Sequence, residues 1–164
     1  MFDLKKSLVI LLIGIMMFLP SCGKKVKKES ITPAKPNCTV SASYNSQEYS
    51  AKLGYSDMGV MTVEMLAPFS GVVFTVDDSG CQLAYDGMKL GYSTQQAQRF
   101  CPFIGLYSVL KTVCYTVPEK ARASGEEYVL QYRTPELSCT AKSDKKDGTL
   151  REIEAENIKF IFNK

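Results

Sequence analysis

Apolar and polar residues alternate with a period of two along the first part of the chain, up to about residue 92. Six such runs follow one another, at residues 38–45, 48–55, 59–66, 71–76, 81–87 and 88–92. Short stretches of turn-forming residues, such as Asn45-Ser46 and Ser56-Asp57, separate them. Alternation over this length is typical of a half-buried antiparallel strand. The pattern therefore predicts six strands before residue 93.

The period changes after Tyr92 and indicates two helices. Ser93 and Gln96 fit a capping box, which predicts a short helix to about Phe100. Pro102 then suits the first turn of a second helix. Apolar residues recur there at spacings of three and four: Phe103, Leu106, Tyr107, Leu110, Val113, Cys114 and Val117. This spacing predicts an amphipathic helix over residues 103–117 that covers an apolar surface.

Strand-like alternation returns after Pro118. We expect a loop over residues 121–125, strands over 127–132 and 136–142, and one long last strand over 150–162 with a bulge near Asn157. The predicted fold class is α+β. It is a single curved antiparallel β-sheet, a half-open barrel, with a helical pair inserted after about six strands and packed on the concave face.

Acidic and nucleophilic residues do not form a catalytic or metal-binding pattern. Asp77 and Asp78 precede Ser79-Gly80, and this sequence favours a tight hairpin turn over a calcium loop. The chain has no histidine, the commonest general base, and none of its cysteines form a C-x-x-C pair. Cys101 lies at a helix start, but we expect it to be buried and unreactive. We therefore predict no enzyme activity, no catalytic residues, no cofactor and no metal site.

The N-terminal residues have the layout of a secretory signal. Lys5 and Lys6 precede an apolar run from Ser7 to Leu19, which is too short to span a bilayer. The run ends in Leu19-Pro20-Ser21-Cys22, which resembles the lipobox of bacterial lipoproteins, although Pro20 departs from the usual middle residue. The resemblance implies cleavage between Ser21 and Cys22 and a diacylglyceryl group, with acyl chains such as palmitate, on the Cys22 thiol.

Domain boundaries follow from this signal. We expect residues 1–21 to be the lipoprotein signal peptide, 22–37 a lipid-anchored basic tether and 38–164 a β-rich domain. Two acyl chains hold a protein stably at a membrane, and the lysines of the tether would add attraction to anionic lipids. The tether lysines are Lys24, Lys25, Lys27 and Lys28. The expected location is the extracytoplasmic face of the bacterial cell membrane, with the lipid anchor inserted.

The order of six strands, a helical pair and more strands resembles the half-open barrel of the LolA/LolB and LppX-type lipoprotein and lipid carriers. The resemblance covers residues 38–164 at the level of layout, and no short motif carries it. It implies an apolar interior against a helical lid, able to hold acyl chains. The residues we expect on such a ligand face are Met61, Val63, Met65, Leu83, Leu106 and Leu110. Residues 69–90 also resemble small Gram-positive surface lipoproteins of unassigned function.

Two functions remain open at this point. The first is a membrane-anchored lipoprotein that binds an apolar or lipid-like ligand. The second is an envelope protein–protein interaction module with a filled core. An interior void lined by Val63, Met65, Leu83 and Leu110 would favour the first, and a filled core the second. Nucleic acid is not an expected partner. Without Asp3, Lys5 and Lys6 of the signal, 18 basic and 16 acidic side chains remain, a net charge of +2 that lies mostly in the tether and leaves the folded part close to neutral.

Five cysteines lie in the predicted domain, namely Cys38, Cys81, Cys101, Cys114 and Cys139. An odd number cannot all pair within one chain. Cys101 and Cys114 would be about 20 Å apart on one helix, at 1.5 Å per residue, which is too far for a disulfide. We expect no disulfide on which the fold depends, and Cys38–Cys139 or Cys81–Cys139 as the pairs to suspect otherwise.

Overall fold

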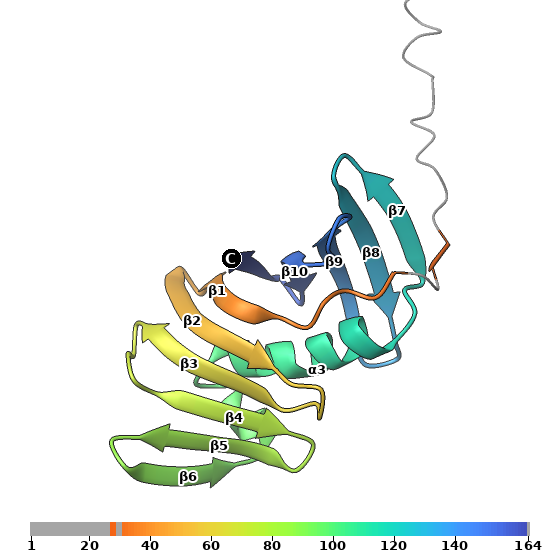
Figure 1. The fold of residues 1–164 in the computed structure, drawn as a ribbon. Helices are drawn as coiled ribbons and strands as arrows, with labels where there is room; N and C mark the ends of the chain where they lie inside the picture. The colour runs from red at the N-terminus through yellow and green to blue at the C-terminus, as the bar shows by residue number, and fades with distance from the viewer. Residues whose placement is uncertain (1–26, 29–30, 164) are drawn as a thin grey trace, which may run out of the picture.

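The structure is a computed structural model, and it describes residues 27–28 and 31–163. Within these residues it has eleven strands and two helices, drawn in Figure 1. The strands before the helices are β1 (Asn37–Tyr44), β2 (Gln47–Tyr55), β3 (Met61–Ala67), β4 (Val73–Asp77), β5 (Gly80–Tyr85) and β6 (Met88–Tyr92). The helices are α2 (Thr94–Ala97) and α3 (Pro102–Tyr115). The strands after them are β7 (Lys120–Ser124), β8 (Glu127–Arg133), β9 (Ser138–Asp144), β10 (Leu150–Ala155) and β11 (Ile158–Asn163).

All eleven strands form one antiparallel sheet in the order β6-β5-β4-β3-β2-β1-β11-β10-β9-β8-β7. Consecutive strands are neighbours in the sheet within β1–β6 and within β7–β11, and β1 also pairs with β11. That pair joins a first half, β1–β6, to a second half, β7–β11. Because β6 and β7 are the two edges and do not pair with each other, the sheet is not closed. Figure 1 shows it as a curved sheet with the two edges far apart.

The six strands predicted before residue 93 are all present, but the second half differs from the prediction. Residues 120–124, expected mostly as loop, form β7 and pair with β8. The single long strand expected over 150–162 is two strands, β10 and β11, paired with each other. Glu156 and Asn157 make the turn between them, with φ of 49° and 70°. A tight hairpin, not a bulge, explains why the apolar parity changes at Asn157.

Both predicted helix starts are confirmed. The Ser93 hydroxyl accepts a hydrogen bond from the Gln96 backbone N–H, and the Gln96 side chain accepts one from the Ser93 N–H, which completes a capping box. α3 begins at Pro102, where the missing N–H leaves no intrahelical bond unmade. The helix ends at Tyr115, two residues earlier than expected.

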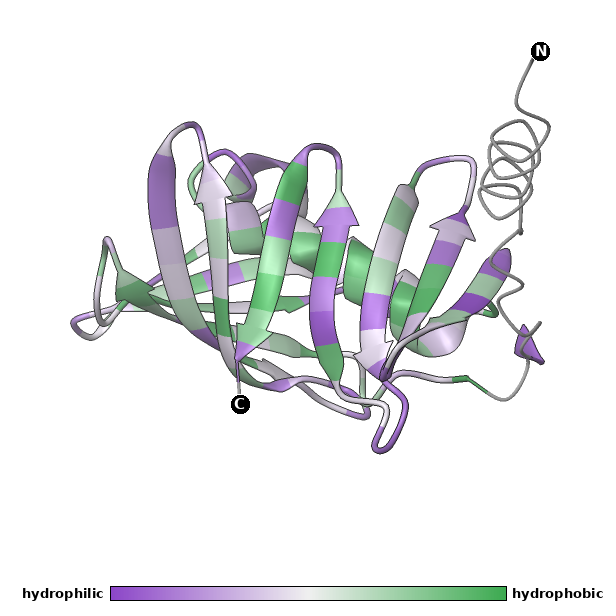
Figure 2. Ribbon diagram, turned by 90° about the horizontal axis from the view of Figure 1, so that it is seen from above, coloured by the Kyte–Doolittle hydropathy of each residue, from purple (hydrophilic) through white to green (hydrophobic). Residues whose placement is uncertain are grey.

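α3 lies against one face of the sheet and contacts both halves (Figures 1 and 2). The Tyr107 ring lies 6.4 Å from that of Tyr55 in β2, and the Phe103 ring lies 6.1 Å from that of Phe160 in β11. Nine residues of the helix are buried: Pro102, Phe103, Ile104, Leu106, Tyr107, Val109, Leu110, Val113 and Cys114. The side chains that alternate inward along the strands meet this helix in one apolar cluster. Burial of that shared surface is the main force holding the two halves together.

The described chain begins on the side of the second half. Lys28 donates a hydrogen bond to the Glu119 carbonyl just before β7, and the Ala34 N–H donates to the Gly148 carbonyl at 2.9 Å. Ile31, Pro33 and Pro36 are buried. Residues 31–36, which the sequence analysis placed in the tether, therefore pack on the domain, because their apolar side chains find a surface there.

Candidate functional site

The predicted ligand face comes together in the structure, in the space between the sheet and α3. Met61, Val63 and Met65 point from β3 toward the helix, and Leu106 and Leu110 point back from α3; all five are at most 2% exposed. Leu83 in β5 is only partly buried and packs against the same cluster. The sequence pattern therefore identified which side chains share one apolar interior.

This interior is filled where those residues meet. The Cys101 thiol lies 3.7 Å from the Met65 sulfur, and both side chains are buried. Three cavities among the described residues lie elsewhere, and none of these three is lined by any of the six predicted ligand-face residues. At this point of the molecule, α3 occupies the place that a ligand would need.

A cavity of about 250 Å³ lies instead at the N-terminal part of α3, beside the β10–β11 hairpin. Its lining includes Pro102, Gly105 and Val109 from the helix and Ile158 and Phe160 from β11. Polar groups of Gln98, Ser108 and Glu156 also reach it. Sequence reasoning did not find this cavity, since it depends on the hairpin at residues 156–157 that was read as a bulge.

The sheet face that meets α3 is not covered over its whole width. In the β5–β6 hairpin, Leu83 pairs with Leu90 and Tyr85 pairs with Met88. These four side chains share a face with Cys81, which is buried under the helices. Yet Tyr85, Met88 and Leu90 are 46%, 59% and 50% exposed. We call Leu83, Tyr85, Met88 and Leu90 the edge strip; it is an apolar continuation of the core that ends in solvent.

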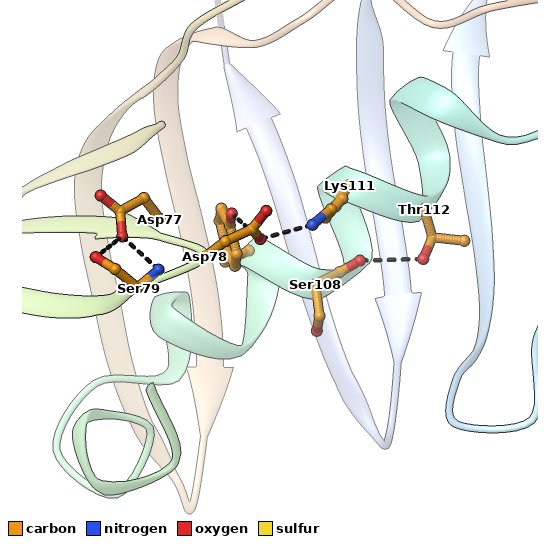
Figure 3. Close-up of polar contacts among 7 residues, drawn as sticks. Asp77, Asp78, Ser79, Ser108, Lys111 and Thr112 are labelled. Atoms are coloured by element: carbon orange, nitrogen blue, oxygen red, sulfur yellow. Dashed lines mark hydrogen bonds and ion pairs between the residues drawn. The ribbon is translucent and has the colours of Figure 1, made fainter. Parts of the chain in front are cut away.

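Asp78 in the β4–β5 turn fastens α3 to the first half of the sheet (Figure 3). Its Oδ1 accepts hydrogen bonds from the Tyr107 hydroxyl at 2.8 Å and from Lys111 Nζ at 2.6 Å. The Lys111 ammonium and then the Tyr107 hydroxyl lower the pKa of the Asp78 carboxyl. Burial, together with the bond to Asp78, raises the pKa of Tyr107. The sequence identified the turn but gave no sign that it bonds to the helix.

The same turn explains the other aspartate. Asp77 Oδ1 accepts hydrogen bonds from the backbone N–H and the hydroxyl of Ser79, at 2.8 and 2.5 Å. These bonds lower the pKa of Asp77 and stabilise the two-residue turn. Hydrogen bonds within the protein therefore hold both aspartate side chains. Among the described residues no group of three or more His, Cys, Asp or Glu is placed to hold a metal ion.

The five cysteines of the domain are free thiols, and Cys81, Cys101, Cys114 and Cys139 are buried. Burial raises the pKa of Cys101 to about 12 and that of Cys81, Cys114 and Cys139 to about 11. It also raises the pKa of Cys38. A thiolate is the reactive form, and these thiols are protonated at neutral pH. They therefore act as small apolar side chains.

The predicted lipidation and cleavage residues, Cys22 and Ser21, lie outside the described residues. Across residues 27–28 and 31–163, no helix has both the length and the apolar character needed to cross a bilayer. No family model and no curated protein matches the chain.

Proposed function

We propose that this protein is an extracytoplasmic lipoprotein, anchored to the bacterial membrane through Cys22, whose domain binds an envelope partner and catalyses no reaction. The sheet in this proposal is a half-open barrel with α3 on its concave face. The Leu19–Cys22 lipobox supports the anchor. The position of Lys28 beside Glu119 supports a tether that joins the domain near β7.

The anchor has a direct test. Cys22→Ala should abolish incorporation of a labelled fatty acid and release the protein from the membrane fraction. Cys38→Ala is the matched control, because it removes another cysteine near the N-terminus and should leave the label in place. Acyl label on Cys22→Ala protein would contradict the proposal.

A non-catalytic role is supported by the state of the groups that could react. The thiols have raised pKa values, and the Asp78 carboxylate is held by Tyr107 and Lys111. General acid–base catalysis at neutral pH needs a group whose pKa lies near the working pH, and these shifts go the other way.

Between the two binding functions, the packing favours an interaction module. The single observation that carries this choice is the contrast between interior and edge. Val63, Met65 and Leu110 fill the space under α3, while Met88 and Leu90 at the edge stay exposed. An exposed apolar surface that continues the core is typical of a site that another molecule covers.

Native mass spectrometry of the purified protein separates the two binding functions. We expect the mass of the chain and its covalent anchor, with no further lipid. The Cys22→Ala protein, expressed in the same cells, should show the mass of the chain alone. A bound lipid at one per chain, retained without the covalent anchor, would show the domain to be a carrier.

The cavity beside the β10–β11 hairpin keeps the carrier as a second candidate. Its volume of about 250 Å³ would accept part of an acyl chain, with apolar contacts from Val109 and Phe160. Gly105→Leu would fill it, because an added Cβ at Gly105 meets nothing closer than the Gln98 side chain at 4.0 Å. Binding of a fluorescent fatty acid that is lost in Gly105→Leu, and kept in Thr112→Leu about two turns further along α3, would support this function.

A further inference from the structure

The β6 edge of the sheet has both an open backbone and exposed apolar side chains, a combination that proteins rarely leave uncovered. β6 is the outermost strand of its half, and no other element formed by residues 31–163 lies beyond it in Figure 1. On the face of the edge strip, its side chains Met88 and Leu90 are 59% and 50% exposed. An open backbone edge beside apolar side chains is a template for pairing with another strand.

The hairpin turn determines which backbone groups of β6 are open. Asp86 and Gly87 have φ of 47° and 77°, as in the two-residue type I′ turn. Such a turn makes Tyr85 and Met88 a hydrogen-bonded pair. Hydrogen-bonded and non-bonded pairs alternate along an antiparallel ladder, so Leu90 also bonds to β5. The N–H and C=O groups of Lys89 and Gly91 therefore point away from β5, toward the open edge.

We propose that a second copy of this chain pairs with this edge, β6 against β6, antiparallel, with the two-fold axis at Leu90. This register opposes Lys89 of each copy to Gly91 of the other, so the outward N–H and C=O groups of both residues meet. All five residues of β6 are then paired. The two Leu90 side chains meet at the axis in a non-hydrogen-bonded pair, where side chains lie closest.

The charges on β6 favour this occupant and this register. Lys89 is the one charged residue of the strand, and it faces a glycine when the axis lies at Leu90. An axis at Lys89 would place two ammonium groups directly opposite each other, which is unfavourable. An axis at Gly91 would extend the pairing into Ser93, which already caps α2. The self-complementary register is thus the one that uses the whole strand without repulsion.

The apolar side chains are self-complementary in the same register. Met88 of one copy faces Tyr92 of the other, and the Tyr92 ring lies 5.9 Å from that of Phe100. Phe100 is 61% exposed. A methionine beside two aromatic rings makes favourable sulfur–aromatic contacts. The axis brings the two edge strips side by side on one face of the extended sheet, where the Leu90 side chains of both copies cover each other and Met88 of each copy contacts Tyr92 of the other.

This inference rests on the proposed function, because it names the partner of the interaction module as a second copy. The chain start does not interfere with this edge. Lys28 and Ala34 bond to the second half, and Lys35 and Pro36 bond to Asp57 and Tyr55 at the end of β2, which three strands separate from β6. Two copies on one membrane would be held at a high local concentration by their anchors, which favours pairing.

Cross-linking through a cysteine at the axis tests the pairing. Two residues in a non-hydrogen-bonded antiparallel pair have Cα atoms about 4.5 Å apart, within disulfide range. Full-length Leu90→Cys protein in mild detergent, treated with a mild oxidant, should therefore form a covalent dimer on a non-reducing gel. Met58→Cys is the matched control. Met58 is 88% exposed, against 50% for Leu90, so random collision would link Met58→Cys more. Wild type gives the background from the native cysteines.

A second variant tests the backbone bonds. Gly91→Pro removes an N–H that points to the open edge, so it should leave the β5–β6 hairpin intact and abolish the dimer, measured by analytical ultracentrifugation with the melting temperature as a folding check. The inference is overturned if Leu90→Cys links no more than Met58→Cys, or if folded Gly91→Pro dimerises like wild type. Acyl labelling at Cys22 is measured in parallel. Monomeric protein that keeps its acyl label overturns the pairing and leaves the proposed function in place.

Discussion

The two edges of the sheet have the same place in the topology and opposite chemistry. β6 presents Met88 and Leu90 on the face that meets α3, and both are exposed. β7 presents only Ala121 and Ala123 on that face, and charged Lys120 and Arg122 on the other. Small inward residues and outward cations protect an edge from pairing. The contrast favours β6 over β7 as the edge at which the proposed partner strand would pair.

The two halves are also fastened to α3 by different means. In the first half, the exposed Asp78 holds Tyr107 and Lys111. In the second half, the buried Tyr132 hydroxyl donates a hydrogen bond to the Val113 carbonyl at 3.3 Å. Tyr55, the first-half tyrosine that packs on the helix, has a buried hydroxyl without a partner among the described residues. Polar attachment is therefore superficial in the first half and internal in the second.

The largest expected effect comes from the helix residue that both halves share. Leu110 is fully buried in the cluster between the sheet and α3. In a filled interior, Leu110→Ala removes apolar contacts and leaves a cavity, so we expect a loss of about 3–5 kcal/mol in the free energy of unfolding. Urea denaturation measures it. Val117→Ala, just after the helix and 61% exposed, is the control and should cost less than about 0.5 kcal/mol.

A much smaller loss in Leu110→Ala would mean that the interior is already partly hollow, and the carrier function would gain support. Leu110→Lys sharpens the result, since an unpaired buried charge is poorly tolerated. A Leu110→Lys protein that unfolds like wild type would show that this helix face does not join the two halves at all.

Removing one hydroxyl from each half tests their different attachment. Tyr132→Phe leaves the Val113 carbonyl without its donor, so we expect a loss of about 1 kcal/mol. Tyr55→Phe removes a buried hydroxyl that has no partner, so the free energy of unfolding should stay equal or rise slightly. The same chemical change should thus lower the free energy of unfolding, measured by urea denaturation, only in the second half. Equal losses in the two variants would contradict the internal attachment of the second half.

Most of the fold could be predicted from the sequence because period-two alternation survives in nearly every strand. The first half was predicted strand by strand. The second half failed at two places for physical reasons. β7 has only alanines as inward residues, so its alternation carries little hydrophobic signal. The Glu156–Asn157 turn contains no glycine or proline, and a parity change there fits a bulge as well as a hairpin.

The site was harder to predict than the fold. The sequence identified Met61, Val63, Met65, Leu106 and Leu110 as one interior face, since that follows from periodicity. Whether the face encloses a void depends on how closely α3 approaches, and no residue pattern gives that distance. The exposure of the edge strip could not be predicted from the sequence for a similar reason. Leu90 has the same pattern as a core residue, and only the end of helix coverage distinguishes them.

A gain in stability is expected at Gly105, where α3 passes the β10–β11 hairpin of the second half. Glycine in a helix interior costs about 1 kcal/mol relative to alanine, and an added Cβ meets the Gln98 side chain only at 4.0 Å. Gly105→Ala should therefore raise the free energy of unfolding by about 0.5–1 kcal/mol. Gly80→Ala, in the first half, is the opposite control. Its φ is 147°, and its Cβ would lie 2.9 Å from the Tyr92 carbonyl oxygen, so it should destabilise. Thermal unfolding of both variants measures the difference.

The smallest effect is expected at Asp78, because its attachment of the first half is exposed to solvent and salt. The pKa of this carboxyl is lowered in the folded protein from its ordinary value of 3.8. A lowered pKa means that the folded state favours the charged form. Its contribution to stability is therefore fully present above pH 3.8 and is lost as the pH falls through the folded value.

Asp78→Asn should melt slightly below wild type at pH 7, and this difference in melting temperature should close on acidification and in high salt. Lys159→Gln removes an exposed lysine that pairs with Glu152 in the other half and leaves this attachment intact. At every pH, Asp78→Asn should therefore lower the melting temperature by the same amount in the Lys159→Gln protein as in wild type. A gap between Asp78→Asn and wild type that persists below the folded pKa would show that the turn itself, and not the ionic bond to α3, is what the substitution disturbs.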